Sequence, residues 1–276
     1  MKHDQMFWQA RDALQLFAQS WEPAGEVKGV ICLVHGLGEH SSRYGHWVEM
    51  LDQADYAVLA TDLRGHGKSE GARGHTPSFE RYMDDLGLLL EEAARRFPEK
   101  PCFLYGHSMG GLLVANYVLR RRPRLAGVVI TSPGLRTALE KQTGKVAAVR
   151  LLGAIAPGLN QPSGLDPATL SRDPAVVEAY RNDPLVHDRI SLGMARGSLA
   201  AIRYAFAHAS EFNLPLLIMH GAADQLVFAE GSSEFAGLVS GECTLKIWDQ
   251  LYHELHNEPE KDQVFAVLVE WLNGKI

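Results

Sequence analysis

The chain has 276 residues, of which 46% are hydrophobic and 22% are charged, and its net charge is −6. This composition is that of a globular protein with a core large enough for one α/β domain. The negative charge, with basic residues scattered apart from those at 120–122, argues against nucleic acid as a partner. No apolar run approaches the length of a membrane span, and we expect no signal peptide.

Three cysteines, Cys32, Cys102 and Cys243, each fall within a predicted strand. An odd number of cysteines in apolar strands is typical of reduced thiols in a reducing compartment. We therefore expect three buried, free thiols and a cytoplasmic location.

The first half of the chain alternates apolar strands with helices. Residues 6–21 carry two aromatic-rich runs, which we expect to form a hairpin at the edge of a sheet. A long helical pattern occupies 79–97, and another follows residue 109. This alternation predicts a mostly parallel sheet with helices on both faces. Continuous apolar runs, typical of strands covered on both faces, lie at 29–34, 56–60, 101–105 and 125–131.

The alternation breaks between residues 135 and 209. That stretch has no β-branched run, and Gly- and Pro-rich connections join its helical segments. We therefore expect a helical cap at 135–209, inserted into a core formed by 1–134 and 210–276. The alternation then resumes with strands at 214–219 and 244–248 and a last amphipathic helix at 259–272.

One predicted helix of this cap is apolar nearly all round. Between Lys145 and Asn160 its only charged residue is Arg150. Such a helix is either buried or faces lipid. Packing over the active site and contact with a membrane or micelle surface therefore both stay open, and in either case we expect a pocket that accepts an acyl chain. The apolar residues are Val146, Val149, Leu151, Leu152, Ile155 and Leu159.

A glycine-flanked turn separates the strand at 101–105 from the helix that follows. Residues 106–110 read G-H-S-M-G, which matches the G-x-S-x-G nucleophile elbow in its strand–turn–helix context. So sharp a turn forces the serine toward positive φ, and glycines leave room where strand and helix nearly touch. The sequence therefore predicts Ser108 as a nucleophile beside the unpaired amides of a helix N-terminus.

A nucleophilic serine needs a base, and the base needs a carboxylate. Catalytic groups of open parallel sheets lie on loops at the carboxyl ends of strands, and Asp224 lies in the loop beyond the penultimate strand. Asp249, at the end of the last strand, is the rival and would otherwise be a strand-end cap. His253 is the favoured base, and His256 is the alternative, which would pack against or cap the last helix. Ser108, Asp224 and His253 stand in the order that the fold requires.

Backbone amides complete the predicted site. The loop after the strand at 29–34 reads H-G-L-G, so the Leu37 amide can donate to a developing oxyanion, and the Met109 amide offers a second donor. Such donors contribute ~3–4 kcal/mol each in the transition state. A mere tight turn is the alternative explanation for Gly36 and Gly38.

Three further motifs are incomplete. Residues 67–69 read G-K-S like the end of a phosphate-binding loop, but Asp62 replaces its first glycine. The run H-E-L-H-N at 253–257 lacks the histidine that a zinc helix needs at its fifth position. The glycines at 36 and 38 lack the third glycine of a dinucleotide fingerprint, because Ser41 stands there. We therefore expect neither a metal nor a cofactor.

With these motifs the chain resembles the α/β-hydrolase superfamily, and within it the branch of monoacylglycerol lipases, lysophospholipases and S33-type serine aminopeptidases. The resemblance implies that Ser108 is the acylated nucleophile, Asp224 the orienting acid and His253 the general base. It also implies an oxyanion hole of Leu37 and Met109. The inserted cap would be a lid. The motifs that carry the resemblance lie at 35–44, 62–69, 106–111, 221–224 and 252–258.

We therefore expect a serine hydrolase that cleaves carboxylic esters of lipid-like substrates, with a monoacylglycerol favoured. A lysophospholipase or general carboxylesterase is the alternative. A C–C bond hydrolase, a perhydrolase, an aminopeptidase and a non-enzymatic ligand receptor on the same fold are further readings. The expected partner is a small lipid ester, with transient contact to a membrane or micelle through the cap.

Overall fold

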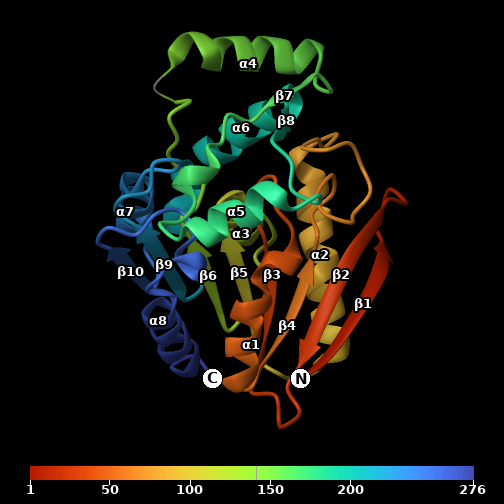
Figure 1. The fold of residues 1–276 in the computed structure, drawn as a ribbon, viewed down its shortest axis with the longest axis vertical. Helices are drawn as coiled ribbons and strands as arrows, with labels where there is room; N and C mark the ends of the chain where they lie inside the picture. The colour runs from red at the N-terminus through yellow and green to blue at the C-terminus, as the bar shows by residue number, and fades with distance from the viewer. Residues whose placement is uncertain (141) are drawn as a thin grey trace.

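An eight-stranded sheet forms the centre of the computed structural model, which describes residues 1–140 and 142–276 (Figure 1). Its strand order is β1-β2-β4-β3-β5-β6-β9-β10. The pairs β1–β2 and β2–β4 are antiparallel, and all other neighbours in the sheet are parallel. The mostly parallel sheet and the edge hairpin are thus confirmed. The strands are β1 Lys2–Gln9, β2 Gln15–Glu22, β3 Gly29–Val34, β4 Tyr56–Thr61, β5 Cys102–His107, β6 Gly127–Thr131, β9 Leu216–Gly221 and β10 Cys243–Trp248.

Helices cover both faces of the sheet, and the alternation of side chains along each strand feeds two cores. Val30, Cys32 and Val34 of β3 pack with α2 and α3. Ile31 and Leu33 point the other way and pack with α1 and α8. This explains why β3 is apolar at every position. The helices of the two layers are α1 Gly45–Gln53, α2 Phe79–Arg96, α3 Met109–Arg121, α7 Ala229–Leu238 and α8 Lys261–Asn273.

Residues between β6 and β9 lie beyond the carboxyl ends of the central strands, at the top of Figure 1. The segment predicted as a helical cap contains three helices and also a two-stranded ribbon, β7–β8, that was not predicted. Each strand of this ribbon has only three residues and no apolar run, so it left no periodic signal. The elements are α4 Thr143–Ile155, β7 Asn160–Pro162, α5 Pro174–Asn182, β8 Arg189–Ser191 and α6 Leu192–His208.

Four short 3₁₀ helices and α7 complete the secondary structure of the described residues. We did not predict α7, because it contains two glycines and two serines, which weaken the helical pattern. Its Phe235 is nevertheless fully buried, so packing against the sheet stabilises the helix. The 3₁₀ helices are η1 Ser41–Tyr44, η2 Pro167–Thr169, η3 Ala209–Glu211 and η4 Leu255–Asn257.

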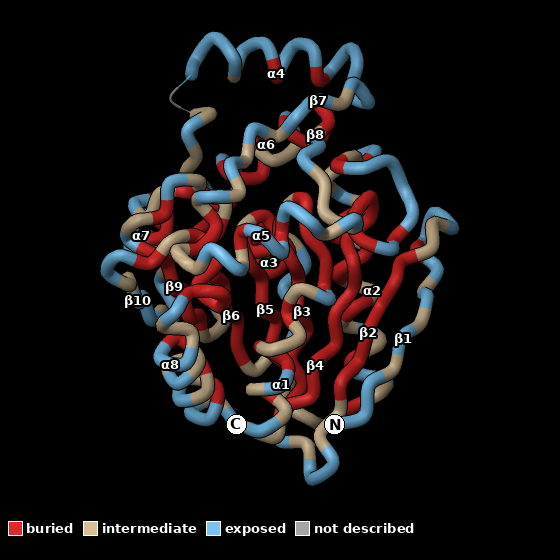
Figure 2. Tube along the Cα trace, viewed as in Figure 1, coloured by how far each residue is buried: buried red, intermediate tan, exposed pale blue. Residues whose placement is uncertain are grey.

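Helix α4 is the outermost element, and its surface is almost entirely exposed (Figure 2). Of its thirteen residues, all described, only Val149 and Gly153 are buried. Gly153 packs tightly on α6, since a Cβ there would lie 2.6 Å from the Leu192 carbonyl oxygen. Of the two alternatives left open by the sequence, burial of this apolar helix over the active site is therefore excluded. Its exposed apolar side chains are Leu151 (63%), Leu152 (46%), Ile155 (73%) and, just beyond the helix, Leu159 (58%).

The three cysteines lie in β3, β5 and β10 and are all free. Cys32 is buried, as expected. Cys102 and Cys243 are only partly buried, because each begins its strand near the end of the sheet. The expectation of burial is therefore wrong for those two thiols. Among the described helices, none has the length and apolar character needed to cross a bilayer.

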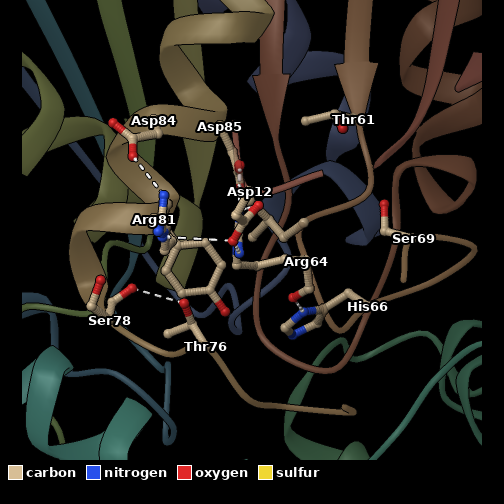
Figure 3. A network of polar contacts seen from close by, with 12 residues as sticks. Asp12, Thr61, Arg64, His66, Ser69, Thr76, Ser78, Arg81, Asp84 and Asp85 are labelled. Carbon is tan, nitrogen blue, oxygen red and sulfur yellow. Dashed lines mark hydrogen bonds and ion pairs between the residues drawn. The ribbon is translucent and has the colours of Figure 1, made fainter. Parts of the chain in front are cut away.

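A buried arginine joins three parts of the fold (Figure 3). Arg64, in the loop after β4, donates through Nε and Nη2 to both carboxylate oxygens of Asp85 on α2, at 2.6 and 2.7 Å. Its Nη1 also donates to Asp12, in the turn between β1 and β2, at 2.9 Å. The same loop contacts the segment between β6 and β9, because the Gly65 carbonyl oxygen accepts a hydrogen bond from the His187 ring. Arg64 therefore joins the hairpin and α2 to a loop whose next residue contacts that segment.

We predict that Arg64→Ala lowers the free energy of unfolding by roughly 3–5 kcal/mol, because it leaves the buried Asp85 carboxylate without its counter-charge. Urea denaturation measures this loss. Arg81→Ala is the matched control: Arg81 contacts Asp12 and Asp84 at longer range and is 39% exposed, so its loss should cost at most about 1 kcal/mol. Equal losses of unfolding free energy in the two variants would contradict the stabilising role of the Arg64–Asp85 pair.

Candidate active site

Ser108 lies at the junction of β5 and α3 with φ +54°, the strained positive φ that the elbow motif predicts. The neighbouring glycines are required sterically. A Cβ at Gly106 would lie 2.5 Å from the Gly110 carbonyl oxygen, and one at Gly110 would lie 2.2 Å from the carbonyl oxygen of Val34. The Ser108 amide also donates to Thr131 at 2.9 Å. The turn therefore holds the serine hydroxyl in one place at the carboxyl end of the sheet.

The structure brings His253 and Asp224 to this hydroxyl. His253 Nε2 lies 2.8 Å from Ser108 Oγ, and His253 Nδ1 lies 2.6 Å from Asp224 Oδ2. The other carboxylate oxygen, Oδ1, accepts bonds from the amides of Leu226 and Val227 at 2.8 and 3.0 Å. Because a carboxylate only accepts, Nδ1 carries the proton and Nε2 is free to accept the serine proton.

Burial and charge act in opposite directions on this pair. Burial alone would raise the pKa of Asp224, but the charge of His253 and hydrogen bonds from His220 and His253 lower it overall. Burial alone would lower the pKa of His253, but the charge and hydrogen bond of Asp224, aided by Glu254 and Glu39, raise it. The result is an ionised carboxylate that stabilises a protonated imidazole.

A second histidine contacts the same carboxylate and was not foreseen from the sequence. His220, the fully buried penultimate residue of β9, places Nε2 3.0 Å from the Val227 carbonyl oxygen and 3.2 Å from Asp224 Oδ2. Its Nδ1 lies 2.7 Å from Ser232 Oγ. A carbonyl oxygen and a carboxylate only accept, so Nε2 carries a proton and donates to Asp224 and Val227. The strand-end position of His220 was the available signal.

The rival residues lie elsewhere. Asp249 is exposed at the end of β10, and no hydrogen bond or ion pair within the described chain involves it. His256 is fully buried and stacks on Tyr44 at 4.5 Å between ring centroids. Burial lowers the pKa of His256 to about 3, so this ring is neutral. Packing was the expected alternative for His256, and the geometry agrees with it.

A cavity of about 360 Å³ opens over Ser108 and His253. Leu37 and Met109 both line it, and neither backbone amide donates to an acceptor among the described residues. Both amides are therefore available to an oxyanion. Most of the remaining lining is apolar, including Leu112, Leu139, Leu165, Ile190, Leu199 and Ile202.

The incomplete motifs serve local structure. Asp62, in place of a phosphate-loop glycine, accepts bonds from the Ser41 amide and hydroxyl and from the Lys68 amide, so it closes a turn. No group of three His, Cys, Asp or Glu side chains within the described chain is arranged to hold a metal ion.

Residues 25–260 match the sequence model of a family described as serine aminopeptidase, S33. The chain is 35% identical over 254 residues to a monoacylglycerol lipase of Mycolicibacterium smegmatis, covering 91% of this chain and 90% of the relative. It is also 36% identical over 249 residues to the phospholipase YtpA of Bacillus subtilis, covering 89% and 95%.

Another relative is longer. The chain is 36% identical over 268 residues to an uncharacterised abhydrolase domain-containing protein of Dictyostelium discoideum, but it spans only 28% of that protein's length. Among solved structures, the monoacylglycerol lipase of Paleococcus ferrophilus aligns with a TM-score of 0.88 at 37% identity, covering 95% of this chain and 99% of the other. The expected α/β-hydrolase fold is thereby confirmed.

We predict that Ser108 reacts with a fluorophosphonate probe at a rate that falls as the pH drops, with a midpoint above about 6.5, the ordinary pKa of histidine. The raised pKa of His253 means that its ring is already protonated at a higher pH, and a protonated ring cannot accept the serine proton. Timed labelling across a pH series measures the midpoint. Asp249→Asn should reproduce the wild-type profile. A labelling rate that does not fall between neutral pH and pH 5 would contradict the role of His253 as the base.

Proposed function

The chain belongs to the serine aminopeptidase S33 family within the α/β-hydrolases, and we propose that it hydrolyses the ester bond of monoacylglycerols. The observation that carries this proposal is the 2.8 Å contact between His253 Nε2 and Ser108 Oγ at the floor of a mainly apolar cavity. The names of the relatives from Mycolicibacterium smegmatis and Paleococcus ferrophilus support the choice of substrate.

Catalysis proceeds through an acyl-enzyme. Ser108 Oγ attacks the ester carbonyl carbon while His253 Nε2 takes its proton, and Asp224 stabilises the imidazolium. The amides of Leu37 and Met109 donate to the oxyanion of the tetrahedral intermediate. The intermediate collapses, glycerol leaves with the proton from His253, and the acyl group stays on the serine. A water molecule, deprotonated by the same ring, then attacks the acyl carbon, and the fatty acid leaves as His253 returns that proton to Ser108 Oγ.

The cavity favours an ester of glycerol over a peptide or a lysophospholipid. Its only acidic lining residues among those described, Glu39 and Glu254, are both paired with Arg43, so neither is free to bind the amino group of a peptide. No lysine or arginine is among the described lining residues, so the cavity offers no cation to a phosphate head group. A lysophospholipase is the second candidate, because the relative YtpA is named a phospholipase.

Residues 135–209 form the lid of this site in our proposal, and α4 is the part that meets the lipid surface. Its exposed side chains Leu151, Leu152 and Ile155 would enter the interface between head groups and acyl chains. Arg150, on the same helix, would lie among the lipid head groups. The three free thiols support the cytoplasm as the place of the reaction.

We predict that Ser108→Ala lowers kcat for fatty-acid release from a monoacylglycerol by roughly 10⁴-fold or more, because no other group takes the acyl chain. Product-resolved chromatography measures the release, and labelling by a fluorophosphonate should vanish together with it. Ser233→Ala, which removes an exposed hydroxyl of α7, is the control and should retain wild-type turnover.

Substrate choice is tested with the same assay on mono-, di- and triacylglycerols and lysophospholipids. Turnover should be greatest on a monoacylglycerol. A preference for lysophospholipids would replace the proposed substrate, and labelling of the wild type without turnover of any ester would indicate a receptor instead of an enzyme.

We predict that the paired substitution Leu151→Ser and Ile155→Ser weakens binding to phospholipid vesicles by at least about 10-fold, since burial of each side chain is worth roughly 1.5–3 kcal/mol. Vesicle co-sedimentation measures the binding. Hydrolysis of a soluble short-chain ester should be unchanged. Leu238→Ser, at an exposed leucine of α7, is the control, and equal vesicle binding by both variants would contradict the contact through α4.

A further inference from the structure

A second set of buried charges lies beside His253. Arg43 Nη1 donates to Glu39 Oε2 at 2.7 Å and to Glu254 Oε1 at 2.6 Å, and Nη2 donates to Glu254 Oε2 at 2.8 Å. The three side chains are 9% exposed or less. We call Glu39, Arg43 and Glu254 the carboxylate cluster. Burial of three charges is costly unless each is paired, and here a single guanidinium bonds both carboxylates.

One end of the carboxylate cluster holds the loop that carries the Leu37 amide. Glu39 Oε1 accepts from the Gly36 amide at 2.6 Å and from the Tyr44 hydroxyl at 2.9 Å. His35 Nε2 accepts from the Leu63 amide, so Nδ1 carries the proton and donates to the Gly36 carbonyl oxygen at 2.8 Å. The Leu37 N–H shares a rigid peptide plane with that carbonyl group. Its direction is therefore determined from both sides of Gly36.

The other end of the cluster holds the loop that carries the base. Glu254 follows His253 directly, and its Oε2 also accepts from the Asn257 side chain at 2.7 Å. Its backbone amide donates to Leu170, in the segment above the sheet, at 2.8 Å. The His253 carbonyl oxygen accepts from the Ser132 hydroxyl at 2.8 Å. Arg43 thus joins the loop of Glu39 to the loop of Glu254, which lies 211 positions beyond Arg43 in the chain.

The cluster also brings charge to the base. One guanidinium and two carboxylates leave one net negative charge next to a ring that becomes positive when it takes the serine proton. Asp224 faces His253 from the loop after β9. His107 of β5, with its ring centroid 4.8 Å away, and His256 of η4 also lie nearby, but burial lowers the pKa of both, so they are neutral. Glu254 and Glu39 are therefore, with Asp224, the charges that stabilise the imidazolium.

We propose that the carboxylate cluster is a positioning device, which holds the oxyanion-binding loop and the histidine loop at a fixed separation and keeps a negative charge beside the base. The inference rests on the proposed function, because it assigns these residues to the same hydrolytic site. The cluster itself does not touch the reacting atoms; it orients the Leu37 amide and positions the His253 ring, and these two groups contact the substrate or Ser108.

Two substitutions separate the geometric contribution from the electrostatic one. Glu254→Gln nearly preserves shape but changes the net charge of the cluster from −1 to 0. It should lower kcat and move the acidic limb of the pH profile of kcat/KM to lower pH, because His253 loses a stabilising charge. Arg43→Lys keeps the charge but loses the two-pronged contact with Glu254. It should lower kcat by roughly 10- to 100-fold through misplacement and leave the acidic limb where it is.

The experiment is a pH series of kcat/KM for a soluble ester on wild type, Glu254→Gln and Arg43→Lys, with thermal unfolding of each. Glu39→Gln has the same charge change and is used if Glu254→Gln does not fold. Glu92→Gln, which removes a carboxylate paired with Arg95 and Arg96 on α2, is the matched control and should change neither quantity.

An acidic limb that does not move in Glu254→Gln, or full kcat in Arg43→Lys, would overturn the inference, and so would loss of thermal stability without either kinetic effect. Failure of the proposed function is distinguishable, because it would remove ester turnover from the wild type itself.

Discussion

A close approach of backbones determines this site. Helix α3 begins so near β3 and β5 that positions 106 and 110 admit only glycine, and Ser108 between them takes a strained positive φ. The burial of the sheet supplies the energy that holds Ser108 in this strained turn. The serine hydroxyl, the Met109 amide and the loop that carries Leu37 are all brought to the same edge by this one contact. The other groups of the site are positioned relative to it.

Charges at this edge are buried in compensated sets. Asp224 is bonded by two histidine rings and two backbone amides, and Arg43 binds two carboxylates at once. Arg64 does the same for Asp85 and Asp12 farther along the sheet. Well-packed apolar residues would often serve stability equally well. The buried charges instead supply directional hydrogen bonds, and each set uses these bonds to hold loops from distant parts of the chain in one relative position.

The segment above the sheet divides into two parts with different surroundings. The part that includes α5 and β8 contacts the core loops. His187, between these two elements, donates through its amide to the Gly38 carbonyl oxygen and through its ring to the Gly65 carbonyl oxygen. Helix α4 instead rests on α6 through Gly153 and turns Leu151 and Ile155 outward. A soluble surface rarely exposes neighbouring apolar side chains without a partner. This division fits the lid that we propose, in which the lower part stays on the core and the outer helix α4 contacts lipid.

The amino-acid sequence alone determined the sheet and the elbow and singled out Ser108 as the candidate nucleophile, because continuous apolar runs and a glycine-flanked turn are local patterns. It also narrowed the acid and the base to two candidates each. Only the tertiary structure decided that Asp224 and His253 meet Ser108, that His220 bonds the same carboxylate, and that α4 is exposed. Arg43 and Glu254 lie in no shared pattern, since their contact joins residues far apart in the chain and depends on how two loops pack at the end of the sheet. Burial and pairing of this kind are properties of the folded packing, and periodicity does not encode them.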